Sequence, residues 1–223
     1  MSEDHDDCCF DGWAKAGAKR ARRKGTAAAV TASLLAALEH AGLRGRSLLD
    51  VGCGTGDLAL GAIERGAERA TGVDLGAGAI ESARSLARER DVSDRATFEV
   101  GDGSILDLPH ADVVVLNRVL CCFPDASALL ANTLPAAGQV FALTAPVDHG
   151  AIGAYNRVMA RLGNVWYAAR DAKYRGFRVT IHDLTDADAR IRGAGFRPSA
   201  RERHRVVWDL RVYERSEPVR ASS

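Results

Sequence analysis

Three glycines between an apolar run and a helical segment constrain this chain more than any other feature. The apolar run is Ser47–Val51, and Gly52, Gly54 and Gly56 follow it at every second position. Glycine lets the backbone turn sharply, and it lets a ligand approach without a Cβ in the way. A helix that begins directly after such a turn offers unpaired N–H groups. The stretch therefore predicts a buried strand, a ligand-binding turn and a helix in close succession.

The rest of the chain alternates short apolar runs with amphipathic segments. Strands are expected at 47–51, 70–74, 96–100, 112–116 and 139–144, and helices at 26–40, 57–65, 77–90, 125–134 and 183–194. Such alternation indicates a parallel sheet that helices cover on both faces. Two more strands, 196–203 and 206–214, are joined so tightly that they must form an antiparallel hairpin. The expected fold is an α/β, doubly wound, seven-stranded sheet, mostly parallel with an antiparallel C-terminal hairpin.

We expect a single domain over 1–223, because this length suits one domain and no linker or repeat divides it. Residues 1–25 form a basic N-terminal leader. Residues 147–176 interrupt the alternation, and a helix is expected within them at about 152–162. This segment is expected to be an insertion or lid over the active site, which in such sheets lies at the carboxyl ends of the strands.

Charge and hydropathy exclude several classes of protein. The chain has 30 Lys and Arg against 29 Asp and Glu, a net charge of +1. This balance excludes a globally basic nucleic-acid binder and a globally acidic, disordered chain. No apolar run approaches the roughly 18–20 residues of a membrane span, and the acidic start lacks the pattern of a secretory signal. A cytoplasmic protein is therefore expected.

The cysteines indicate reduced thiols rather than disulfides or a metal site. They are Cys8, Cys9, Cys53, Cys121 and Cys122, an odd number that includes two adjacent pairs. Adjacent cysteines rarely bridge each other, and a chain without a secretory signal keeps its thiols reduced. Because no C-x-x-C spacing is present, no metal is expected.

The glycine spacing and Asp74 indicate what the turn binds. Asp74 ends the next strand, 22 residues after Gly52, where an acid can accept hydrogen bonds from both hydroxyls of a ribose. Dinucleotide sites carry G-x-G-x-x-G, whereas this chain has G-x-G-x-G with Asp57 at the place of the third glycine. A carboxylate repels a pyrophosphate but not a cationic or zwitterionic ligand. The pattern therefore favours S-adenosylmethionine over a nicotinamide dinucleotide.

With these motifs in order, the chain resembles the class I S-adenosylmethionine-dependent methyltransferases over roughly residues 30–215. The motifs that carry the resemblance are Leu48–Gly56, Gly72–Asp74, Gly101-Asp102 and Asp112–Leu116. The resemblance implies a Rossmann-like sheet and S-adenosylmethionine as the cofactor. Cys9-Phe-Asp and Phe177-Arg-Val are also similar to magnesium-protoporphyrin O-methyltransferases, a small-molecule type, although no residue here assigns a tetrapyrrole substrate.

The resemblance also implies a cofactor site at the carboxyl ends of the strands. Its expected members are Asp50, Gly52, Cys53, Gly54, Gly56, Asp74, Leu75, Asp102, Gly103 and Asn117. Asp50 would reach the cofactor's amino group, Asp74 the ribose hydroxyls, and Asp102 the adenine amino group. Asn117 and Arg118 follow the fourth strand, where the family places residues near the transferred methyl, so Asn117 is also a catalytic candidate. The structural alternatives are a helix cap for Asp74 and a turn for Asp102.

The expected partner is a small-molecule methyl acceptor. The segment from Asn117 lacks the Asn-Pro-Pro-aromatic motif of many enzymes that methylate the amino groups of bases, so nucleic acid is not favoured. Tyr155, Trp166 and Arg178 are the expected acceptor contacts. Transfer needs mainly in-line positioning, and a general base only if the acceptor keeps its proton. His149 is the first candidate for that base.

Two alternatives stay open. The basic leader would suit the phosphates of RNA, which would make the chain an RNA methyltransferase. The chain would otherwise be a non-catalytic regulatory protein that binds S-adenosylmethionine, because a fold supports a ligand more firmly than a reaction. The sequence predicts neither the identity of the acceptor nor the oligomeric state.

Overall fold

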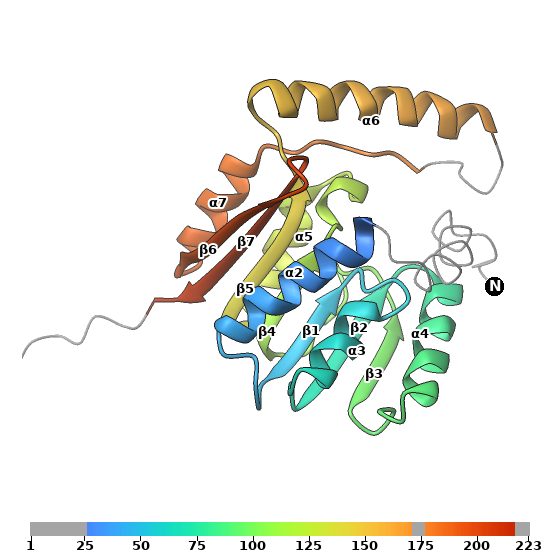
Figure 1. Ribbon diagram of the computed structural model, residues 1–223, viewed down its shortest axis with the longest axis vertical. Helices are drawn as coiled ribbons and strands as arrows, with labels where there is room; N and C mark the ends of the chain where they lie inside the picture. Colours follow the sequence, from blue (N-terminus) through green and yellow to red (C-terminus); the bar gives the residue numbers. More distant parts are fainter. Residues whose placement is uncertain (1–25, 171–176, 217–223) are drawn as a thin grey trace, which may run out of the picture.

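A seven-stranded sheet runs through the computed structural model, which describes residues 26–170 and 177–216 (Figure 1). Its strands are β1 Ser47–Val51, β2 Arg69–Asp74, β3 Ala96–Val100, β4 Ala111–Asn117, β5 Ala137–Pro146, β6 Phe196–His204 and β7 Trp208–Arg215. The strand order is β3-β2-β1-β4-β5-β7-β6. The first five strands are parallel, and β7 pairs antiparallel with both β5 and β6. The expected sheet and hairpin are confirmed.

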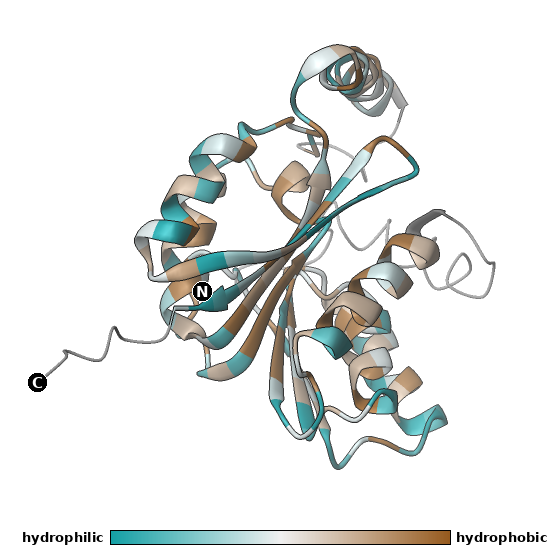
Figure 2. Ribbon diagram, turned by 60° about the vertical axis from the view of Figure 1, so that its left-hand side comes forward, coloured by the Kyte–Doolittle hydropathy of each residue, from teal (hydrophilic) through white to brown (hydrophobic). Residues whose placement is uncertain are grey.

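Helices cover both faces of the sheet, as Figure 2 shows. The described helices are α2 Thr26–His40, α3 Asp57–Glu64, α4 Ala77–Glu89, α5 Ala126–Ala136, α6 Gly150–Arg170 and α7 Leu184–Gly193, with a 3-10 turn, η1, at Leu120–Cys122. All of them except α6 pack on the sheet. The apolar sides of α2, α3 and α4 share one buried core with the sheet, and those of α5 and α7 share the other. The strands between these two cores are therefore buried on both faces.

The order of the strands determines where a ligand can enter. The chain runs outward from β1 to β2 and β3, and then returns to place β4 on the other side of β1. In such sheets, a crevice opens beyond the carboxyl ends of the strands where the direction reverses. Asp50 lies at this point, paired in register with Gly72 of β2 and Val115 of β4.

Helix α6 replaces the shorter helix that we expected within residues 147–176, and it stands apart from both helical layers at the top of Figure 1. Asn156 donates hydrogen bonds to the carbonyl oxygens of Val147 and Val207 (2.9 and 3.1 Å), and Asn164 exchanges two with the backbone of Val179 (2.9 and 2.7 Å). Large apolar side chains of α6 that are exposed instead are Tyr155, Val158, Met159, Leu162, Val165 and Trp166. The helix therefore turns its asparagines to the protein and an apolar face to solvent.

None of the described helices, α6 included, is both long and apolar enough to cross a bilayer. The leader at residues 1–25 and the end of the expected insertion at 171–176 lie outside the described residues.

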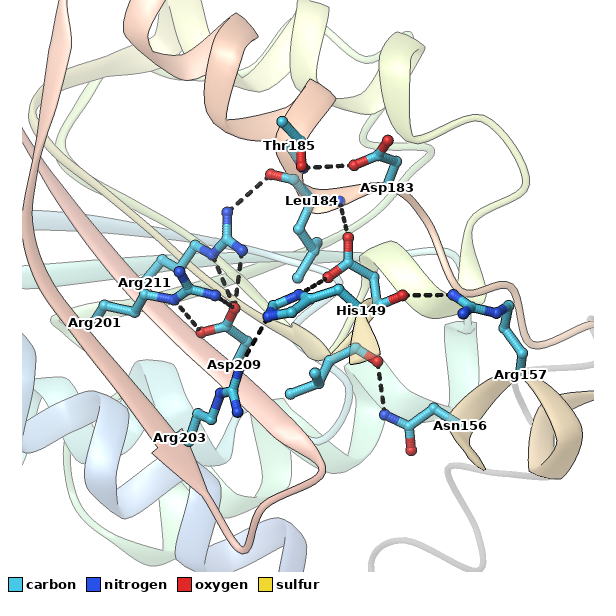
Figure 3. A network of polar contacts seen from close by, with 12 residues as sticks. His149, Asn156, Arg157, Asp183, Leu184, Thr185, Arg201, Arg203, Asp209 and Arg211 are labelled. Atoms are coloured by element: carbon cyan, nitrogen blue, oxygen red, sulfur yellow. Dashed lines mark hydrogen bonds and ion pairs between the residues drawn. The ribbon is translucent and has the colours of Figure 1, made fainter. Parts of the chain in front are cut away.

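A buried ion cluster around Asp209 connects the terminal hairpin to α7 (Figure 3). The Asp209 side chain is fully buried and accepts hydrogen bonds from Arg201 (3.0 and 2.6 Å) and Arg211 (3.2 and 2.9 Å). Burial alone would raise the pKa of Asp209, but the two arginines lower it below its usual value. Arg211 also donates to the carbonyl oxygen of Leu184 at 2.8 Å, so the cluster links β6, β7 and α7.

We predict that Asp209→Ala lowers the free energy of unfolding by about 3–5 kcal/mol, because it leaves the buried Arg211 guanidinium unpaired. Urea unfolding measures the loss. The matched control is Asp186→Ala, which removes an exposed ion pair with Arg190 (2.8 Å) and should cost less than about 1 kcal/mol. Equal losses in the two variants would contradict the importance of the buried cluster.

Candidate functional site

A pocket that is partly open to solvent lies at the carboxyl edge of the sheet. Residues from the ends of β1, β2 and β3 line one side: Val51, Gly52, Val73, Asp74, Leu75, Gly101 and Gly103. The segment after β4 and helix α5 line the other: Val119, Cys122, Phe123 and Leu129. The pocket thus occupies the crevice that the strand order creates.

The structure brings four of the predicted cofactor residues into the pocket wall: Gly52, Asp74, Leu75 and Gly103. The other predicted members do not line it and lie behind or beside it: Asp50, Cys53, Gly54, Gly56, Asp102 and Asn117. Their contacts show which of them are structural.

Asp74 connects the end of β2 to the glycine turn. Its Oδ2 accepts a hydrogen bond from the N–H of Gly54 (2.8 Å), and its Oδ1 accepts one from the N–H of Gly76 (2.9 Å). These bonds fix the carboxylate at the pocket wall. A carboxylate in the pocket wall is a group of the type that accepts hydrogen bonds from ribose hydroxyls.

The glycine turn owes its shape to close packing. Gly52 has φ +75°, and a Cβ there would lie 2.4 Å from Cγ2 of Val119. Gly56 has φ +79°, and a Cβ there would lie 2.9 Å from the Phe98 ring, so this glycine lets α3 approach the sheet. Cys53 is buried in the core beneath the turn, so its thiol faces away from the pocket's lining.

Asp50 is a carboxyl group at the centre of the sheet with 1% of its surface exposed. Its Oδ1 has no hydrogen-bond partner among the described residues. Burial raises the pKa of Asp50 to about 7; the charge of Asp74 adds to the rise and that of Arg118 opposes it. A buried carboxylate without a partner is unfavourable, so this position is suited to receive a cationic group of a ligand.

Asn117 has both ends of its amide engaged. Its Nδ2 donates to Oγ1 of Thr31 in α2 (3.0 Å), and its Oδ1 accepts from Oγ1 of Thr144 in β5 (2.8 Å). The side chain therefore holds the end of β4 between α2 and β5. A catalytic role for Asn117 stays a prediction, and the observed contacts are those of a residue that positions the following turn.

Asp102 stabilises the turn after β3. Its Oδ1 accepts hydrogen bonds from the N–H and the hydroxyl of Ser104 (2.8 and 2.7 Å). Asn132 of α5 braces the same turn by donating to the carbonyl oxygen of Gly103 at 3.0 Å. The turn thereby presents Gly101 and Gly103 to the pocket, and adenine binding by Asp102 itself stays a prediction.

His149 lies in the polar network of Figure 3 rather than in the pocket wall. Arg203 donates to its Nε2 (2.9 Å), so Nδ1 carries the proton and donates to Asp148 (2.8 Å). The second oxygen of Asp148 accepts from the N–H of Leu184 (2.8 Å) at the start of α7. Both ring nitrogens are therefore occupied, and a general-base role stays a prediction.

The predicted acceptor contacts are exposed and do not line the pocket. Tyr155 and Trp166 lie on the outward face of α6, with 54% and 48% of their surfaces exposed, and Arg178 is exposed as well. Among the described residues, no three His, Cys, Asp or Glu side chains gather as a metal site would require. Cys8 and Cys9 lie outside these residues.

The second wall of the pocket consists of residues that were not predicted from the sequence. Val119, Cys122 and Phe123 reach it because β4 is followed by the single 3-10 turn η1. Their position directly after the fourth strand was a signal that could have identified them, since the carboxyl ends of strands carry the ligand contacts in such folds.

Residues 43–164, more than half of the chain, match the family model for a methyltransferase domain. The ribosomal protein L11 methyltransferase of Yersinia pseudotuberculosis serotype IB is 37% identical over 123 residues, which are 55% of this chain and 41% of that protein. The same enzyme of Pectobacterium atrosepticum is 35% identical over 130 residues, 58% of this chain and 43% of that protein. The chain therefore spans less than half the length of these curated relatives.

Two solved structures share the architecture. The magnesium protoporphyrin IX methyltransferase of Synechocystis PCC 6803, with bound SAH, aligns with a TM-score of 0.68 at 21% identity over 86% of this chain and 84% of that one. An S-adenosylmethionine-dependent methyltransferase of Mesorhizobium loti aligns with a TM-score of 0.58 at 18% identity over 78% and 92%. At these identities the likeness shows the fold, and it confirms the expected Rossmann-like sheet.

We predict that Asp50→Asn stabilises the ligand-free protein at pH 8 by about 2–4 kcal/mol, roughly 4 °C or more in Tm. The pKa of Asp50 is about 7 in the fold against an ordinary value of 3.8, so ionisation destabilises the native state as pH rises between these values. The stability gained by Asp50→Asn should therefore grow from pH 5 to pH 7 and then level off. Thermal unfolding at several pH values measures it.

The control is Asp112→Asn. The carboxylate of Asp112 accepts hydrogen bonds from the N–H and hydroxyl of Ser47 (2.9 and 2.7 Å), which lower its pKa. This variant should lose stability at pH 8. A loss of stability in Asp50→Asn as well would contradict the predicted effect of burial.

Proposed function

Because this chain belongs to the methyltransferase domain family, as its sequence predicted, we propose that it is an enzyme that transfers a methyl group from S-adenosylmethionine to an oxygen or nitrogen atom of a small organic acceptor. One observation carries the proposal. Gly52, Asp74, Leu75 and Gly103, which come from three separate strand ends, converge in a single pocket at the reversal point of the sheet.

The donor groups of the site fit S-adenosylmethionine. The unpartnered Oδ1 of Asp50 is an acceptor for an ammonium group, and the Asp74 carboxylate lies in the pocket wall as an acceptor for ribose hydroxyls. Gly101 and Gly103 line the part of the pocket where an adenine ring would lie. When bound, the cofactor supplies a methyl group on a sulfonium, which is already a good leaving group.

The second wall of the pocket supports transfer by positioning. Val119, Phe123 and Leu129 form an apolar surface that excludes water from the reacting atoms and orients an apolar acceptor. An acceptor that arrives deprotonated needs no further group from the protein. For one that keeps its proton, His149 can act as a base only after Arg203 releases Nε2.

A protein acceptor is the second candidate. The specific observation in its favour is the match to ribosomal protein L11 methyltransferases, at 34–37% identity over about half of this chain. The RNA alternative depends on the basic leader, which lies outside the described residues. A regulatory protein that only binds S-adenosylmethionine would show affinity without turnover on any acceptor.

We predict micromolar binding of S-adenosylmethionine and S-adenosylhomocysteine, and none of NAD, in calorimetric titrations of the purified protein. Transfer of labelled methyl groups to small organic molecules, to ribosomal proteins and to RNA would then separate the three acceptor classes. Failure to bind either sulfur ligand would contradict the proposed function. If only protein is labelled, the methyltransferase activity stands, and the acceptor is a protein rather than a small organic molecule.

We predict that Asp74→Ala weakens S-adenosylmethionine binding by about 1–3 kcal/mol, the scale of lost hydrogen bonds to a charged group. The control is Asp183→Ala, because Asp183 also accepts a hydrogen bond from a backbone N–H, that of Thr185, but at the start of α7. It should lose about 1 kcal/mol of stability and no affinity. Unchanged affinity in a folded Asp74→Ala protein would remove this residue from the site.

A further inference from the structure

Arg118 has an unusual backbone conformation at the edge of the pocket. It follows the last residue of β4 and precedes the pocket-lining Val119, and its φ is +62°. A left-handed backbone is unfavourable for a residue with a Cβ and persists only where its surroundings impose it. Here the N–H of Arg118 donates to both the carbonyl oxygen (3.1 Å) and the hydroxyl (2.9 Å) of Thr144.

The same surroundings bury part of the Arg118 guanidinium without pairing it. Its Nε is buried and has no hydrogen-bond partner among the described residues. An arginine side chain stays charged at any physiological pH, so a buried donor of this kind is costly unless a ligand accepts from it. The strained backbone and the unpaired donor therefore point to an anionic group that is bound at this place.

Asp50 supplies the opposite charge nearby. It lies in β1, in register with Val115 of the adjacent strand β4, three residues before Arg118. No ion pair joins Asp50 to Arg118 within the described part of the chain, and each side chain has a buried polar atom without a partner. A separated carboxylate and guanidinium are complementary to a zwitterion, which presents an ammonium and a carboxylate on one carbon.

We propose that Arg118 binds the α-carboxylate of S-adenosylmethionine, whose α-ammonium the family resemblance already assigns to Asp50. The proposal rests on the proposed function and gives Arg118 a role other than the one near the transferred methyl that the family resemblance implies. It also orients the ligand. The amino-acid end lies between β1 and β4, and the adenosine lies toward Asp74 and Gly103 at the ends of β2 and β3.

The test compares ligands with and without the amino-acid end. Wild-type protein and Arg118→Met are titrated with S-adenosylhomocysteine and with 5′-methylthioadenosine, which lacks that end. Loss of a charge-assisted, bidentate contact between the guanidinium and the carboxylate should weaken S-adenosylhomocysteine binding about 10- to 100-fold in the variant. Binding of 5′-methylthioadenosine should stay within about twofold, because this ligand never reaches the guanidinium.

A second variant controls for the possibility that Arg118→Met does not fold. Arg118→Asn removes the guanidinium with a residue that tolerates positive φ, so the turn before Val119 is kept. It should show the same selective loss. Decarboxylated S-adenosylmethionine adds a direct readout, since it keeps the amine and lacks the carboxylate, and its affinity should not respond to either variant.

Each result decides the assignment. Equal S-adenosylhomocysteine affinity in wild type and both variants would overturn it and would place the guanidinium on the acceptor side. Parallel loss of both ligands in the folded Arg118→Asn protein would also overturn it, because the residue would then act on the whole pocket. If the wild-type protein binds neither ligand, the proposed function fails and this assignment fails with it.

Discussion

The burial of a carboxyl group in the central strand is the constraint on which the site depends. Asp50 lies between β2 and β4 with 1% of its surface exposed, and its Oδ1 has no partner among the described residues. A folded chain tolerates such a group only where the remaining interactions outweigh its desolvation. Two tightly packed apolar cores and the parallel ladder on either side supply them. The side chains around this carboxylate therefore compensate its charge only in part.

The fold was predictable because its signals are local. Strand–helix alternation and the glycine turn each lie within a few residues, and their bounds changed little in the structure. The turn after β4 was not predictable in the same way. Asn117 donates a hydrogen bond to a threonine 86 positions earlier in the chain, and a contact over that separation leaves no local pattern. The wall residues Val119, Cys122 and Phe123 could have been identified from their position after β4, whereas the contact that holds the end of β4 could not.

The acceptor side shows a different limit of sequence reasoning. Helical spacing in α6 correctly separates an apolar face from a face with asparagines. Tyr155 and Trp166 were expected to contact an acceptor because their segment was placed over the carboxyl edge of the sheet, where apolar walls suit small organic acceptors. Here Asn156 and Asn164 satisfy backbone groups at irregular places, at Val147, Val179 and Val207, and these bonds determine which face is inside. Periodicity reveals two faces, but it does not reveal which one the protein selects.

The attachment of α6 has a consequence for how such a chain can diversify. Two asparagines join it to backbone atoms, and its large outward side chains add nothing to either core. Selection on folding therefore acts strongly on the sheet and weakly on this surface. The helix can therefore exchange its outward residues at little cost to folding, whereas residues of the two buried cores cannot be exchanged so freely.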